Sequence, residues 1–187
     1  HLNKLESLLS IARKLGFTAP IEGAVHIHFD ATVLMSAPVL AKLMRVLWIF
    51  GDSLKQLLES NPHCTRLGQW SQDLYDHIQR PEWAELSWEE ARQSLAEFTL
   101  NKYCDFNIKN IIHPSADKQT FELRILPVLM HGERIIEIAA LFEAILRWAI
   151  HSEKDQELPA NLQEFLPELK LSPQLHDIWM HRYLTTK

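Results

Sequence analysis

The chain has 187 residues, 47% hydrophobic and 23% charged, a composition that is typical of a globular domain and excludes a disordered chain. The formal net charge of −5 and the lack of a basic stripe between aromatic residues give no support to nucleic-acid binding. No apolar run approaches the roughly 20 residues that a membrane-spanning helix needs, so we expect no membrane partner.

The N-terminal part of the chain predicts a helix followed by a strand. Leucines recur at helical spacing over residues 2–16, and Gly16 ends this amphipathic helix. Residues 24–30 then alternate with period two, as a half-buried strand does. The apolar face of the strand carries Val25, Ile27 and Phe29, and its polar face carries His26, His28 and Asp30.

A run of helices is predicted between this strand and residue 100. Hydrophobic periodicity indicates a long helix and two shorter ones, covering about 36–60, 71–79 and 87–98. Ser36 is the expected N-cap of the first, and Ser-Trp-Glu-Glu at 87–90 forms a capping box for the third. A polar loop after the long helix carries Arg66.

The next part of the chain contains a second alternating strand. Residues 101–112, which precede it, are ambiguous between an extended segment and a loop with strand character. Residues 119–126 alternate clearly and are followed by Pro127, which favours the end of a strand. One face of this strand carries Phe121, Leu123 and Ile125, and the other carries Thr120, Glu122 and Arg124.

The C-terminal part of the chain is predicted to be helical. A strongly amphipathic helix covers about 133–151, and Ser172 with Pro173 begins a final helix. Because strands and helices do not alternate as in parallel sheets, the order of elements predicts an α+β fold. Cys64 and Cys104 are the only cysteines and form no disulfide framework, so we expect a reducing, cytoplasmic environment.

The polar face of the first strand combines two imidazoles with a carboxylate. His26 and His28 lie about 7 Å apart, from a rise of roughly 3.3 Å per residue. One metal ion can therefore bind both, or one imidazole can bind metal while the other contacts substrate. A solvated edge strand would show the same pair of histidines, but Asp30 in the same row and the apolar opposite face favour a functional interpretation.

The polar face of the second strand places a carboxylate beside a guanidinium. A cross-strand salt bridge on a hydrated sheet would explain Glu122 and Arg124 on their own. In a functional interpretation the carboxylate binds Mg²⁺ and the arginine binds a phosphate oxygen, as phosphoryl transfer requires. Both polar motifs occur in one chain, each on a strand with an apolar opposite face, and this combination favours the functional interpretation.

Other candidate residues carry less information. Arg66 lies in a loop, where arginines are usually solvated. Lys102, Tyr103 and Asn107 lie in a segment with few simple structural duties, although packing and capping would also explain them. The chain has no nucleophile-and-base spacing and no glycine-rich phosphate loop.

Taken in order, these motifs resemble those of the carboxylate–amine ligase superfamily of glutamine synthetase and glutamate–cysteine ligase. The likeness is closest to the bacterial amidoligases. It rests on Gly-x-x-His-x-His-x-Asp at 23–30, a long helix, a loop arginine, Tyr-x-x-Phe-Asn at 103–107, Thr-x-Glu-x-Arg at 120–124 and a long amphipathic helix. The similarity in order covers residues 1–150, and we expect residues 151–187 to be a helical extension of the same domain.

The resemblance implies an enzyme that uses ATP and Mg²⁺ or Mn²⁺ to join a carboxylate to an amine through an acyl phosphate. The active site would lie on the concave polar face of a curved antiparallel sheet whose apolar face is covered by helices. Substrates would be small-molecule or peptide carboxylates and amines, and a homo-oligomer is compatible with this activity. By analogy, His26 and Glu122 would bind the metal, and His28 would lie on the substrate side. Arg124 would stabilise the transferring phosphoryl group, and Arg66 would contact phosphate or substrate. Asn107 would lie beside nucleotide or substrate.

One motif of the superfamily has no counterpart before His26. Members usually have an earlier strand with paired glutamates, Glu-x-Glu, that supplies much of the metal site. This region offers only Glu6, on a predicted helix, and Glu22. We expect the paired strand either to lie upstream of His1 or to be absent from a degenerate member.

Two other functions remain open at this point. His-x-His-x-Asp at the end of a strand also resembles metal-dependent hydrolases, for which His63, His113 and His131 would be further ligand candidates by residue type alone. The metallo-β-lactamase-like motif expects a histidine where this chain has Ala31, and amidohydrolases, which the motif also resembles, need further metal-binding His and Asp at strand ends. A non-catalytic interaction domain, in which acidic C-terminal helices contact a partner, is the second alternative.

Overall fold

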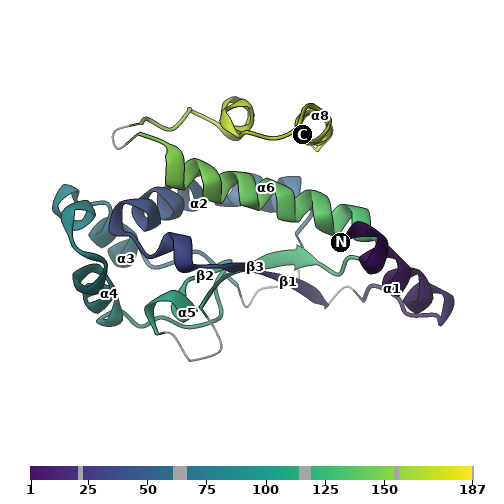
Figure 1. Ribbon diagram of the computed structural model, residues 1–187, viewed down its shortest axis with the longest axis horizontal. Helices are drawn as coiled ribbons and strands as arrows, with labels where there is room; N and C mark the ends of the chain where they lie inside the picture. Colours follow the sequence, from purple (N-terminus) through teal and green to yellow (C-terminus); the bar gives the residue numbers. More distant parts are fainter. Residues whose placement is uncertain (21–22, 61–66, 114–118, 154–155, 187) are drawn as a thin grey trace.

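The computed structural model describes residues 1–20, 23–60, 67–113, 119–153 and 156–186. Within these ranges a three-stranded antiparallel sheet is combined with eight α-helices, which confirms the α+β class (Figure 1). The strands are β1 (Ala24–Asp30), β2 (Phe106–Asn107) and β3 (Thr120–Pro127). The helices are α1 (Leu2–Lys14), α2 (Ala37–Leu57), α3 (Gln72–Ile78), α4 (Trp88–Ala96), α5 (Lys109–Ile112), α6 (Gly132–His151), α7 (Leu162–Phe165) and α8 (Pro173–Thr185).

The predicted elements form close to their expected bounds, and local chemistry explains their starts. The capping box of α4 is confirmed, because the Ser87 hydroxyl accepts a hydrogen bond from the Glu90 N–H while Glu90 accepts one from the Ser87 N–H. Ser36 stands at the N-cap of α2, but its side chain makes no capping hydrogen bond. The ambiguous segment 101–112 resolves into β2 and the single-turn helix α5.

The sheet has the strand order β1-β3-β2, so β3 is the central strand. His28 and Asn107 both pair with Glu122 across it, which aligns three polar positions from three strands. A bulge interrupts the β1–β3 ladder, since Val25 pairs with Leu126 while Ile27 pairs with Leu123. Ile125, which the alternation predicted on the apolar face, is buried in the core, and so is Leu126, which lies opposite Val25 past the bulge.

Helices α2 and α6 cover the apolar face of the sheet, as the resemblance implied (Figure 1). Their inward side chains are fully buried with those of the central strand. This core includes Leu40, Leu43, Met44 and Leu47 of α2, Ile138, Leu141 and Phe142 of α6, and Phe121 and Leu123 of β3. Although both helices are long, no helix in the described ranges is long and apolar enough to cross a membrane.

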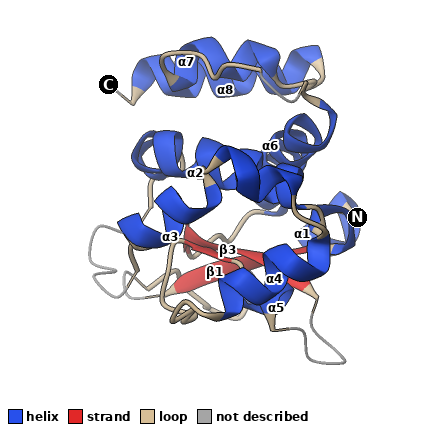
Figure 2. Ribbon diagram, turned by 90° about the vertical axis from the view of Figure 1, so that its left-hand side faces the viewer, coloured by secondary structure: helices blue, strands red, loops and turns tan. Residues whose placement is uncertain are grey.

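The C-terminal segment forms a third layer over α2 and α6 (Figure 2). Phe165 of α7 is completely buried, and its ring centroid lies 5.0 Å from that of Phe50 on α2 and 5.2 Å from that of Trp148 on α6. Trp179 of α8 is likewise fully buried. These side chains belong to the same hydrophobic core as the sheet and its covering helices.

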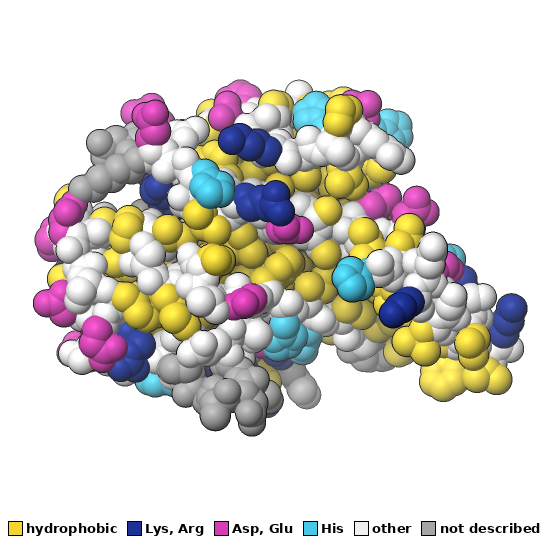
Figure 3. All heavy atoms as spheres, in the orientation of Figure 1, with side chains coloured by type: hydrophobic (Ala, Val, Ile, Leu, Met, Phe, Trp, Pro, Cys, Tyr) yellow, Lys and Arg dark blue, Asp and Glu magenta, His cyan; other side chains and the backbone are white. Residues whose placement is uncertain are grey.

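Helix α1 projects from one end of the molecule and attaches to the start of α6 (Figure 1). The Glu6 carboxylate accepts a hydrogen bond of 2.7 Å from the backbone N–H of Gly132. A Cβ at position 132 would lie 3.0 Å from the Glu6 nitrogen, so glycine permits this close approach. No residue of α1 is buried, and Leu8 and Leu15 are 64% and 72% exposed. Figure 3 shows hydrophobic side chains gathered on this projecting helix.

Replacing Phe165 by alanine tests whether the third layer is integral to the core. We expect Phe165→Ala to lower the free energy of unfolding by about 3–5 kcal/mol, because it leaves a cavity between α2 and α6. Urea unfolding followed by circular dichroism measures this loss. Leu184→Ala, at a side chain that is 58% exposed on α8, is the control and should change stability by less than about 0.5 kcal/mol. Equal, small effects of both variants would contradict the layered core.

Candidate functional site

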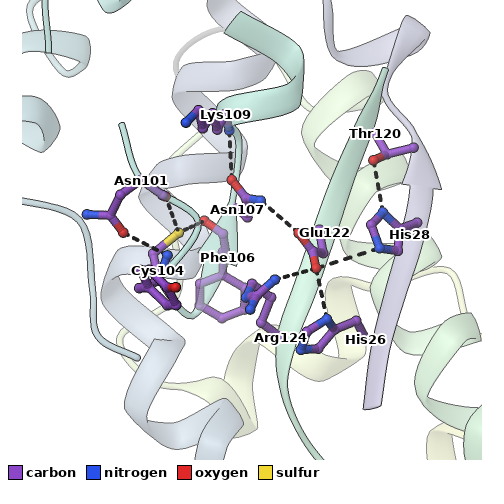
Figure 4. Close-up of polar contacts among 11 residues, drawn as sticks. His26, His28, Asn101, Cys104, Phe106, Asn107, Lys109, Thr120, Glu122 and Arg124 are labelled. Atoms are coloured by element: carbon purple, nitrogen blue, oxygen red, sulfur yellow. Dashed lines mark hydrogen bonds and ion pairs between the residues drawn. The ribbon is translucent and has the colours of Figure 1, made fainter. Parts of the chain in front are cut away.

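The candidate residues from three strands meet on the polar face of the sheet (Figure 4). Strand β1 contributes His26 and His28, the central strand β3 contributes Glu122 and Arg124, and β2 contributes Asn107. The antiparallel register places Glu122 between His28 and Asn107. The sequence-based prediction that the two alternating strands turn their polar faces toward one shared region is therefore confirmed in geometry.

Glu122 is the common partner of all four other side chains. Its Oε1 lies 2.6 Å from Arg124 Nη1, 3.0 Å from His26 Nδ1 and 3.6 Å from His28 Nε2. Its Oε2 accepts a hydrogen bond of 2.7 Å from the side-chain amide of Asn107. The Glu122 side chain is only 7% exposed, so these groups replace the water that would otherwise solvate the carboxylate.

The surroundings of Glu122 keep it ionised. Burial alone would raise the pKa of this carboxyl, but the Asn107 hydrogen bond and the positive charge of Arg124 lower the pKa below its ordinary value. The nearby histidines act in the same direction. A buried, ionised carboxylate is stable here only because N–H donors surround it on the polar face of the sheet.

His26 is held in its neutral form. Burial lowers the pKa of its imidazole, Arg124 lowers it further, and the opposing effect of Glu122 is smaller. In the neutral tautomer that donates Nδ1–H to Glu122, Nε2 keeps its lone pair. The side chain is 35% exposed, so this lone pair is available to a proton or a ligand on the polar face.

His28 and Asp30 have separate local partners at the far end of β1. The His28 Nδ1 lies 2.9 Å from the Thr120 hydroxyl, which fixes the ring so that Nε2 faces Glu122. Asp30 turns to Thr32, whose hydroxyl and backbone N–H both donate to its Oδ1. These hydrogen bonds lower the pKa of Asp30 and leave it outside the Glu122 group.

Arg124 is anchored beside an ion pair between a buried carboxylate and a partly exposed lysine that the sequence analysis did not predict. Its backbone N–H donates to the carbonyl of Asp105. The Asp105 side chain is 3% exposed and lies 3.1 Å from Lys55 Nζ on α2. Asp105 between two less polar residues was the only signal of this pair in the sequence. Only the folded structure shows that Lys55 of α2 supplies its counter-charge.

Asn107 links the Glu122 group to a neighbouring cavity. Its amide nitrogen donates to Glu122, and its Oδ1 accepts the backbone N–H of Lys109 at the start of α5. A cavity of about 140 Å³ opens beside it, lined in part by Asn101, Tyr103 and Lys109. Tyr103 is 54% exposed and is therefore reachable from solvent.

Comparison with known proteins decides the family. A family model described as "Putative amidoligase enzyme" matches residues 1–146. The chain belongs to the amidoligase family. No curated protein and no solved structure matches it, so the likeness to the glutamine synthetase fold stays a prediction. Residues 147–187, which hold the end of α6 and the third layer, lie beyond the amidoligase match.

The polar face of this amidoligase does not by itself fit a divalent cation. Among the described residues, no group of three or more His, Cys, Asp or Glu side chains is arranged to hold a metal ion. Among the described side chains, Glu122 is the one carboxylate in contact with His26 and His28, and both of its oxygens are engaged by N–H groups. Mg²⁺ prefers several oxygen ligands. The assignment of His26 and Glu122 as metal ligands therefore stays a prediction.

Several predicted candidates lie away from the Glu122 group, and others fall outside the residues that the structure describes. Arg66, His63 and Glu22 fall outside the described residues. Glu6, which lies on the helix predicted before His26, accepts the N–H of Gly132 at the start of α6. Burial raises the pKa of the Cys104 thiol to about 11, so this amidoligase keeps it protonated and unreactive.

The lowered pKa of Glu122 predicts a pH-dependent contribution to stability. Its ionisation stabilises the fold above the ordinary carboxyl pKa of 4.5, and this contribution is lost as the pH falls through the lower folded-state value. We expect Glu122→Gln to lower the free energy of unfolding by about 1–3 kcal/mol at neutral pH. The difference from wild type should shrink below about pH 4. Urea unfolding at a series of pH values measures it.

The matched control is Glu143→Gln on α6, whose carboxylate is 55% exposed and pairs with Arg147. This variant should differ from wild type by less than about 0.5 kcal/mol at every pH. A gap between wild type and Glu122→Gln that stays constant down to acid pH would contradict the proposed ionised state.

Proposed function

We propose that the protein is an ATP-dependent amidoligase that joins a carboxylate to an amine through an acyl phosphate. Membership of the amidoligase family supports the ligase activity. The observation that carries the finer proposal is the convergence of Arg124, Asn107, His26 and His28 on the single carboxylate of Glu122. This arrangement fixes cationic and neutral N–H groups on one open face, where a phosphoryl group would be held.

Arg124 is the residue that we assign to the transferring phosphoryl group. Glu122 holds its Nη1 at 2.6 Å, so the orientation of the guanidinium is set before substrate arrives. The Arg124 side chain is 13% exposed, and its buried Nε makes no hydrogen bond to any described residue. ATP, when bound, supplies the phosphoryl group that turns the carboxylate into an acyl phosphate.

His26 is suited to the proton transfer that amide formation requires. The amine nitrogen attacks the acyl carbon, the bond from that carbon to the phosphate oxygen breaks, and the nitrogen loses a proton. A neutral imidazole with a free Nε2 accepts this proton near neutral pH. We assign His28, whose ring is fixed by Thr120, to orienting the substrate.

The cavity beside Asn107 supports a role for this residue in binding. Asn101, Tyr103 and Lys109 give the cavity polar walls, and none of the described residues that line it is acidic. It therefore suits the neutral or anionic part of a nucleotide or of a carboxylate substrate better than an ammonium group. Arg66 keeps its proposed role as a further phosphate or substrate contact.

The divalent cation that accompanies ATP in this proposal needs oxygen ligands in addition to Glu122. Nucleotide phosphates and water are the usual sources of such ligands for Mg²⁺. Because the described side chains do not complete a metal site, we assign no catalytic step to the cation.

A non-catalytic interaction domain is the second candidate, and one observation favours it. Leu8 and Ile11 of helix α1 and Leu15 directly after it are exposed on a surface that no described residue covers. Binding of ATP to the polar face discriminates the two functions. Nuclear magnetic resonance signals of His26 and His28 that do not respond to ATP and Mg²⁺ would favour the interaction domain.

The decisive variants of the proposed activity change Arg124 and Glu122. In the full-length protein, ADP and phosphate release should require both a carboxylate and an amine, so panels of both are screened with ATP and Mg²⁺. We expect Arg124→Gln and Glu122→Gln each to lower this turnover by roughly 10²–10³-fold, because each removes preorganised phosphoryl stabilisation. Circular dichroism confirms that the variants are folded.

Arg147→Gln is the matched control, because Arg147 is an exposed arginine on α6 that pairs only with Glu143 among the described residues. It should keep wild-type turnover. Undiminished turnover in both Arg124→Gln and Glu122→Gln would rule out the assigned roles.

A further inference from the structure

A second cluster of charged side chains lies between the helix layers, on the side of α2 and α6 that faces away from the sheet. Arg134 and Glu137 come from α6, and Trp179 and Arg182 come from α8. Trp179 is fully buried, and the guanidinium carbons of Arg134 and Arg182 lie 5.1 and 5.0 Å from its ring centroid. Two cations therefore contact one indole ring.

The positive charge of this cluster is only partly compensated. Both guanidiniums share the carboxylate of Glu137, at 2.7 Å from Arg182 Nη2 but 3.9 Å from Arg134 Nη1. Arg134 also lies 3.9 Å from Glu59, whose side chain is 75% exposed, so this second pair is weak. Within the described residues, two buried or half-buried cations thus face one buried anion.

The cluster also has donors without acceptors and an adjoining space. Nη1 of Arg134 and Nη1 of Arg182 are both buried and make no hydrogen bond to any described residue. A cavity of about 180 Å³ opens beside them, between the end of α2 and the end of α8. It is lined by Leu57, Glu59, Arg134, Arg182, Thr185 and Thr186. The threonine hydroxyls donate to helix carbonyls, so the two arginines remain as the donors for a ligand.

We propose that this cavity binds a phosphate group, either free or carried by a small molecule. The planar fork of a guanidinium matches phosphate oxygens, and a tetrahedral anion offers several oxygens to two arginines at once. Such an anion adds negative charge beside two guanidiniums whose second carboxylate, Glu59, is exposed and 3.9 Å away, and it gives the buried Nη1 groups their acceptors after small side-chain rotations. Because α8 lies outside the amidoligase match and supplies Arg182, binding fastens the third layer to α6.

Titration with inorganic phosphate, against chloride at equal ionic strength, tests the site. Two signals are followed: the thermal unfolding midpoint and the indole N–H resonance of Trp179, which Trp179→Phe identifies. We expect phosphate, but not chloride, to raise the midpoint and to shift the Trp179 signal saturably. Phosphoserine is titrated in parallel, and whichever of the two ligands binds more tightly identifies the free or the carried form.

Three variants separate this site from the polar face of the sheet. Arg182→Lys keeps the charge but loses the fork, and should weaken phosphate binding about tenfold. Glu59→Gln removes the acid that lines the cavity, and should strengthen binding about threefold. Arg124→Gln should leave the Trp179 response unchanged, and so should the exposed control Arg147→Gln.

Failure of the Trp179 signal to respond to phosphate beyond the chloride effect would overturn the proposal. Loss of the response in Arg124→Gln would also overturn it, by assigning the phosphate to the sheet. If Arg182→Lys does not fold, Glu59→Gln decides alone, because its side chain is exposed; unchanged affinity in that variant contradicts the site. None of these outcomes depends on ligase activity.

Discussion

The buried carboxylate of Glu122 is the interaction on which the polar face of the sheet depends. A charge at this position loses most of its water, and it is stable only because side chains of all three strands donate to it or contact it. In return, Glu122 fixes the positions of Arg124 and Asn107 and selects a tautomer of His26. The five side chains therefore form one electrostatic unit.

The rest of the fold supports this unit from the opposite face. Helices α2 and α6 bury the apolar sides of β1 and β3, so the strands cannot slip without exposing the core. Lys55 of α2 forms an ion pair with the side chain of Asp105, and the backbone carbonyl of Asp105 accepts the N–H of Arg124. The position of Arg124 is thus set by a helix as well as by its own strand.

Local patterns in the sequence predicted the parts of this arrangement that depend on local chemistry. The alternation of residues 24–30 is set by which side chains can be buried, so the bounds and the two faces of β1 were predictable. The capping box of α4 was predictable for the same reason, because its partners are three residues apart. That the polar faces of the two strands turn toward one shared region also followed from this alternation, but the contacts of Glu122 with the histidines were not predicted.

The remaining features depend on tertiary structure and could not be predicted from one sequence. The bulge opposite His26 shifts the pairing of β1 with β3, and no local pattern marks it. The Lys55–Asp105 pair joins residues 50 positions apart. The amphipathic pattern of α1 predicts a helix correctly, but the number of buried residues depends on what packs against it, and none is buried.

The central claim is that Glu122 is ionised, buried and held by donors from three strands. The most direct test is a titration of its side-chain carboxyl carbon by nuclear magnetic resonance in the folded protein. The account predicts a titration midpoint below the ordinary value of 4.5, moving upward when Asn107→Ala removes one donor. A midpoint at or above 4.5 in the wild-type protein, unchanged by that substitution, would contradict it.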